Sequence, residues 1–160
     1  METILKPFLD LMREIYIGSE NEEVWIIDAK PGHGLTMTIK ELTAKQASTP
    51  QVKGGSTVAA HVEHLRWSIE FAMEFYQGRQ PEGNWAESWK IHEVNEEQWE
   101  QLQLALLVAY QKLVYAIKDV KDWSNPFLLK GTLALLPHAA YHLSAIKQLI
   151  IAANSDSVQH

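Results

Sequence analysis

Hydrophobic residues recur every three or four positions along most of this chain, a spacing that predicts amphipathic helices. The first such segment covers residues 3–17 and ends at Gly18 and the polar residues that follow it. A short further helix is expected over residues 35–44, after a stretch interrupted by Pro31, Gly32 and Gly34. Residues 48–55 are expected to form a loop.

The second long helix is expected to begin at an N-cap, Ser56 or Thr57, and to run to about Tyr76. On a helical wheel its charged and amide side chains fall in one narrow arc, and nearly all the others are apolar. A helix with so narrow a polar face is buried on most sides, as bundle helices are. His61 lies near the middle of the apolar arc, and His64 lies towards one side of it.

Two more helices are expected in the second half of the chain. Asn95 is a good N-cap for a helix that ends near Lys118, and Pro126 suits the first turn of a last helix over residues 126–153. Pro137 falls inside that last helix and predicts either a kink or a later start. Residues 81–94, with Trp85 and Trp89, are expected to be a loop. These two tryptophans either line a pocket or cover the end of the bundle, and we favour covering. No segment has the period of a strand, so the predicted class is all-α.

The composition narrows the possible functions. The 160 residues suit one globular domain, residues 1–160, with 46% hydrophobic and 21% charged residues. The net charge is -6 and the basic residues are scattered, which argues against nucleic acid as a partner. We expect no signal peptide and no membrane span, and therefore a cytoplasmic protein. The absence of cysteine excludes thiolate zinc sites, iron-sulfur clusters and cysteine nucleophiles.

Two histidine pairs carry the candidate chemistry, His61 with His64 and His138 with His142. Residues four apart on a helix lie on one face a turn apart, so the second pair can reach one ion. A third imidazole from a facing helix would complete a site for a divalent metal. The alternative is that these are buried histidines whose ring nitrogens are satisfied by hydrogen bonds. The second pair lacks the glutamate of the H-E-x-x-H zinc protease motif.

Four segments resemble those of the DinB-like family of helical proteins. The run from Gly55 to Arg66, GSTVAAHVEHLR, is similar to the signature of the family's second helix. The run from Leu136 to Leu149, LPHAAYHLSAIKQL, is similar to the signature of its fourth helix, and the two Trp-containing segments between residues 84 and 99 are also typical. The resemblance covers roughly residues 34–150. It implies a four-helix bundle, here with a possible short extra helix near the N-terminus, often in a homodimer.

The resemblance also implies a metal site with three histidine ligands. The family's helix-two ligand is the histidine directly before leucine, which is His64 here, and its helix-four ligands correspond to His138 and His142. Ser144, where many members have glycine, and Pro137 depart from the pattern without removing a ligand. The expected cofactor is one divalent ion, zinc or nickel. His61 diverges from His64 by about 60° on the helix and is a fourth ligand, a hydrogen-bonding partner of a ligand, a base or a packing residue.

The sequence leaves three functional interpretations open. The first is a metal-dependent enzyme, either a thiol transferase or a hydrolase. Some DinB-like proteins resemble thiol transferases. The substrates of a transferase would be a small-molecule thiol and an electrophile, and that of a hydrolase would be a compound cleaved by water. The second is a non-enzymatic metal-binding or stress-associated protein, in which the ion mainly stabilises the helices. The third is a helical dimer without metal.

Overall fold

In the computed structural model, which describes residues 2–19, 24–28 and 33–156, the chain is all-helical. The described residues form six α-helices and one 3₁₀ helix, and no strand occurs among them. The predicted all-α class is therefore confirmed. Pro31 and Gly32, expected to interrupt the chain, lie outside the described residues.

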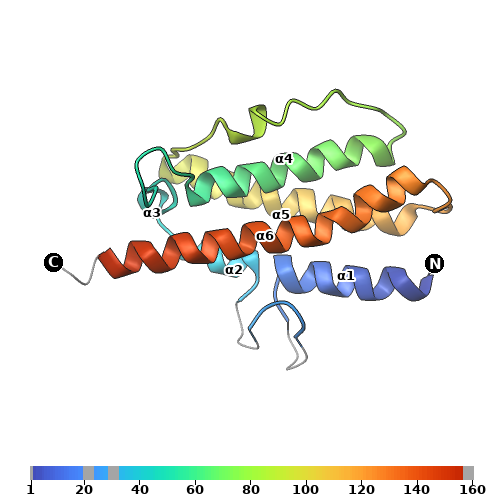
Figure 1. Cartoon of the computed structure of the whole chain (residues 1–160), viewed down its shortest axis with the longest axis horizontal. Helices are drawn as coiled ribbons and strands as arrows, with labels where there is room; N and C mark the ends of the chain where they lie inside the picture. Colours follow the sequence, from blue (N-terminus) through green and yellow to red (C-terminus); the bar gives the residue numbers. More distant parts are fainter. Residues whose placement is uncertain (1, 20–23, 29–32, 157–160) are drawn as a thin grey trace.

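Four of the helices are long: α1 (Glu2–Tyr16), α4 (Val58–Tyr76), α5 (Glu96–Asp119) and α6 (Pro126–Asp156). Their axes lie roughly along one direction, with α4 packed against both α5 and α6, and α1 packed against α5 and α6 (Figure 1). α4 and α5 run the same way, and α6 returns antiparallel to both (Figure 1). This direction of α6 brings its middle turns opposite the first turns of α4.

The two helices in the middle of the chain begin at the residues expected from their capping signals. Thr57 caps α4, its hydroxyl accepting a hydrogen bond from the Ala60 amide. The same hydroxyl donates to the carbonyl oxygen of His92 at 2.9 Å, which ties the end of the α4–α5 connection to the start of α4. Asn95 caps α5 in a capping box with Gln98. Side-chain caps of this kind are local, which is why they can be recognised in a sequence.

The single helix expected over residues 35–44 is wrong. The structure has two short helices there, α2 (Leu35–Lys40) and α3 (Ala44–Ala47). Thr43 forms a capping box with Gln46 and so begins a second helix where the first was expected to continue. The capping box competes with helix continuation because the Thr43 backbone takes an extended conformation.

The expectation that the last helix starts late is also wrong, since α6 begins at Pro126 and continues through Pro137. A proline inside a helix removes one backbone N–H, which deprives the carbonyl four residues earlier of its partner. That carbonyl belongs to Leu133, and both Leu133 and Pro137 are exposed, so water can take the place of the missing donor.

The connection between α4 and α5, residues 77–95, runs back along the outer side of α4 (Figure 1). It contains a 3₁₀ helix, η1 (Glu87–Trp89), which packs against α4 and was not expected from the sequence. The core beneath is made by large apolar side chains of all four long helices, with full burial at Ile15, Leu65, Leu106, Leu113 and Ile146. The apolar width of α4 is therefore largely covered within the chain. Among the described residues, no helix combines the length and the apolar character that crossing a membrane requires.

Candidate metal centre

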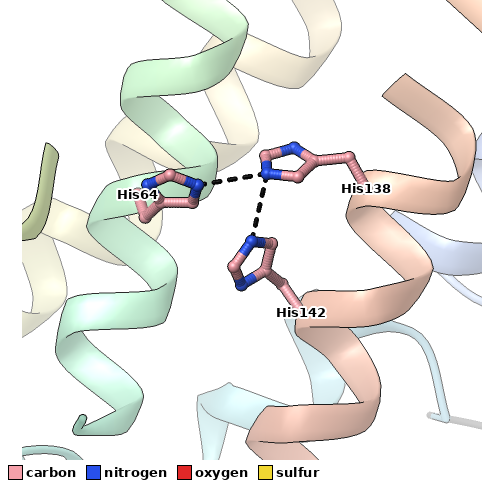
Figure 2. Close-up of side chains that lie close together, drawn as sticks. All are labelled: His64, His138 and His142. Atoms are coloured by element: carbon pink, nitrogen blue, oxygen red, sulfur yellow. Dashed lines mark hydrogen bonds between the residues drawn. The ribbon is translucent and has the colours of Figure 1, made fainter. Parts of the chain in front are cut away.

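Three histidines from two antiparallel helices come together between α4 and α6. His64 projects from α4, and His138 and His142 project from successive turns of α6, all with their rings pointing towards one point (Figure 2). The Nε2 atom of His138 lies 3.1 Å from Nε2 of His64 and 3.1 Å from Nε2 of His142. These are the three residues named from the sequence, and each offers one nitrogen within 4.8 Å of the others.

The other ring nitrogen of His64 is held by Ser88 of η1. Nδ1 of His64 lies 2.7 Å from the Ser88 hydroxyl oxygen, and that hydroxyl donates its hydrogen to the Trp85 carbonyl oxygen at 2.7 Å. Because the hydroxyl has only one hydrogen, its oxygen must accept from Nδ1–H of His64. The hydrogen of His64 is thereby placed on Nδ1, and the lone pair of Nε2 faces the other two histidines. Ser88 is fully buried, and sequence reasoning did not identify it.

His142 has an equivalent partner in His61. Nδ1 of His142 lies 2.8 Å from Nδ1 of His61. The other ring nitrogen of His61, Nε2, lies 3.0 Å from the hydroxyl oxygen of Ser56. When Ser56 accepts from His61 and His61 accepts from His142, Nε2 of His142 is left unprotonated towards the centre of the cluster. His61 thus contacts a ring of the cluster from behind and does not belong to the group of converging nitrogens.

The donor set of the cluster fits a divalent cation. The hydrogens of His64 and His142 lie on their outer nitrogens. The two contacts of 3.1 Å that Nε2 of His138 makes therefore have only one hydrogen between them, the one that Nε2 of His138 itself can carry. A cation at the centre would instead be met by three lone pairs. Nitrogens bound to one tetrahedral zinc ion at about 2.0–2.1 Å are separated from each other by roughly 3.3 Å, close to the 3.1 Å of the two contacts that His138 makes.

Burial keeps these imidazoles neutral at physiological pH. The pKa of His142 is lowered to about 3, first by burial and then by the neighbouring histidines His138, His64 and His61. The pKa of His64 is lowered to about 4 for the same reasons, burial again being the larger cause. Burial also lowers the pKa values of His61 and His138. Only the neutral imidazole has a free lone pair, so this environment favours metal ligation.

No carboxylate belongs to the group of described residues that converges here. Glu63, next to His64 in sequence, pairs instead with Arg66 at 2.6 Å. Three neutral imidazoles leave the full charge of a bound cation uncompensated, which makes it a stronger Lewis acid than a carboxylate-rich site would.

The two tryptophans of the connection both lie against the ring of His64. For Trp89, the role we favoured, covering the end of the bundle, stays a prediction. Trp89 stacks on the His64 ring with 4.3 Å between centroids and an interplanar angle of 21°. Trp85 instead lines a cavity, so the pocket-lining interpretation holds for this residue. Its ring is half exposed and contacts the rings of Trp67 and Phe71 on α4.

The cavity that Trp85 lines begins at His138 and has a volume of about 360 Å³. It continues along the groove between α4 and α6, where Phe75 of α4 and Phe127 of α6 meet with 5.4 Å between ring centroids. His138 therefore belongs both to the histidine cluster and to the wall of an apolar cavity.

Comparisons with known proteins leave the site to be interpreted from its own geometry. The chain matches no family model, no curated protein and no solved structure.

Proposed function

We propose that this chain is a DinB-like metal-dependent enzyme that holds one divalent ion, zinc or nickel, through His64, His138 and His142. In this proposal α1, α4, α5 and α6 are the four helices of the DinB-like bundle. The reaction is the transfer of a small-molecule thiol to an electrophile or a hydrolysis, and the protein works in the cytoplasm. The observation that carries the proposal is the convergence of three Nε2 atoms. The two contacts of 3.1 Å among them have only one hydrogen available, so one of the contacts lacks a donor.

When bound, the ion would act as a Lewis acid. It would lower the pKa of a coordinated thiol or water towards neutrality. The protein residues supply the rest of the arrangement. Ser88 and His61 orient two of the ligands by hydrogen bonds to their Nδ1 atoms. Trp89 covers one side of the His64 ring and keeps water from it.

The cavity beside His138 favours an enzyme over a protein in which the ion only stabilises the helices. A purely structural ion is usually closed off by four protein ligands, whereas a catalytic ion keeps a position open to substrate. Three histidines converge here, and the described residues supply no fourth ligand to the group. The space next to one of the three is large enough for a small molecule.

Elemental analysis of protein purified without a nickel column tests the proposal. We expect close to one divalent ion per chain, and loss of that ion in the His64→Ala and His142→Ala variants. His92→Ala is a matched control, because its side chain is exposed on the connection and lies outside the cluster. Metal-free wild-type protein that also binds neither added zinc nor added nickel would contradict the proposal. Retained metal in His64→Ala would contradict the ligand assignment.

A further inference from the structure

We infer that the apolar cavity beside His138 binds the uncharged body of the substrate, an aliphatic or aromatic small molecule whose single metal-binding head group reaches the histidine cluster. This inference rests on the proposed function, since it assigns the head group to the ion held by the three histidines. It adds the substrate's chemical class, which neither the cluster nor the DinB-like resemblance indicates.

The position of the cavity is the first argument. His138 is shared between the cluster and the cavity, and the lining then follows α6 back towards its first turn at Phe127. His138 lies eleven positions after Phe127, which corresponds to roughly 16 Å along the helix axis. A ligand lying in this groove therefore has one end at the histidine cluster and extends away from it between α4 and α6.

The chemistry of the wall is the second argument. Aromatic and aliphatic side chains make up most of it, and no lining residue carries a charge. The hydroxyls in the wall are already engaged: Ser68 donates to the His64 carbonyl at 2.6 Å, and Tyr76 contacts Thr132 at 2.5 Å. Thr132 in turn donates to the Leu128 carbonyl. A polar ligand body would find few partners here, whereas an apolar body would be removed from water without losing hydrogen bonds.

One residue allows the cavity to be narrowed without disturbing the helix. Gly131 lies in α6 on the cavity wall, and a Cβ atom added there would meet no atom within 4 Å. Because Gly131 is exposed and also lines the cavity, Gly131→Leu adds a side chain at the open side of the cavity and should narrow it, while improving helix propensity. Lys130→Leu is the matched control, because it adds the same side chain at an exposed neighbouring position that does not line the cavity.

The test uses two kinds of probe on the full chain. The neutral fluorophore N-phenyl-1-naphthylamine reports on the cavity without requiring metal. Calorimetry of zinc-loaded protein then compares acetohydroxamate, which is only a head group, with octanohydroxamate, which has the same head and an alkyl body. We expect the fluorophore to bind and the longer hydroxamate to bind more tightly by on the order of tenfold or more, because its chain is buried. Gly131→Leu should remove both effects, Lys130→Leu should keep them, and acetohydroxamate should bind all three proteins equally.

Each other outcome overturns the inference in a recognisable way. Zinc-loaded wild-type protein that binds both hydroxamates equally leaves the metal centre standing and removes the cavity from the substrate site. Fluorophore binding that weakens as the protein concentration rises assigns the cavity to a second copy of the chain. Protein that takes up no zinc but still binds the fluorophore overturns the proposed function, and with it the shared substrate. Unchanged probe binding in Gly131→Leu places the ligand elsewhere.

Discussion

Nδ1 of His61 lies 2.8 Å from Nδ1 of His142, although 81 residues separate the two histidines in sequence. The contact gives His61 a defined place beside the cluster, where the sequence had left four roles open. A ring that hydrogen-bonds the outer nitrogen of a ligand fixes its orientation and its tautomer. In the proposed metal site, His61 is accordingly expected to act as a positioning residue for His142.

The contact between His61 and His142 predicts different roles for His61 and His64, which lie one turn apart on α4. We expect His64→Ala to lower zinc affinity by on the order of a thousandfold, because one of three ligands is lost, and His61→Ala by on the order of tenfold, because only the orientation of His142 is lost. Zinc titration of both variants in one buffer checks the order. A larger loss in His61→Ala than in His64→Ala would mean that the family motif has been assigned to the wrong histidine.

Ser88 should affect the metal site without touching the ion. Ser88→Ala removes the acceptor that holds the hydrogen of His64 on Nδ1. We expect zinc affinity to fall by about tenfold, with the helical content unchanged. Ser124→Ala, at an exposed position before α6, should leave zinc affinity as it is. An unaltered affinity in Ser88→Ala would show that the His64 ring is held by its packing against Trp89 alone.

Sequence reasoning predicted most elements that depend on local signals, with the Thr43 capping box as an exception, and it missed Ser88, whose role depends on a distant contact. Thr57 and Asn95 cap their helices through neighbouring amides, so the starts of α4 and α5 could be predicted. The spacing of His138 and His142 likewise gives a shared helix face. Ser88, by contrast, lies 24 residues beyond its partner His64, in a connection whose path follows from packing on α4. The pattern of apolar and polar residues in this connection gives no indication of that contact.

Loss of a ligand on α6 should leave the helices folded. His138→Ala and His142→Ala should each retain nearly all of the circular dichroism signal of a helical protein. The buried apolar side chains of α4, α5 and α6, not an ion, supply most of the stabilisation. Thr132→Ala, on the same helix, is the control for a general effect of truncating a buried side chain. A collapse of helicity in either histidine variant would identify the ion as structural and favour the non-enzymatic alternative.

We predict a homodimer that forms through a face of α5. Leu104 and Tyr115 on α5 are 62% and 74% exposed, and with Val108 they fall within about 40° of each other around the helix. Such an apolar stripe on a charged surface is typical of an interface. Light scattering should give twice the chain mass of 18.2 kDa. Leu104→Lys should shift the mass to that of one chain, whereas Ile151→Lys on α6 should not.

Glu14 should be important for stability although it lies far from the cluster in sequence. One oxygen of its buried carboxyl accepts hydrogen bonds from three successive amides, those of Trp25, Ile26 and Ile27, at 2.5–2.9 Å. Glu14→Ala leaves these donors without a partner and should lower the free energy of unfolding by about 2–4 kcal/mol. Urea unfolding checks this. Asp10→Ala, which removes only an exposed pair with Lys6, should change the stability by less than about 0.5 kcal/mol.

The path of the α4–α5 connection has a consequence for how fast the site exchanges its contents. The hydrogen-bond partner of His64, the ring stacked on it and one wall of the cavity all belong to the same five residues, Trp85 to Trp89. Apart from the turn of η1, this stretch forms few backbone hydrogen bonds of its own. Its local opening therefore costs less free energy than global unfolding, and amide hydrogen exchange should be faster there than in α4. If the site holds an ion or a ligand, we therefore expect its residence time to depend on the opening of this segment, with the helices beneath it staying closed.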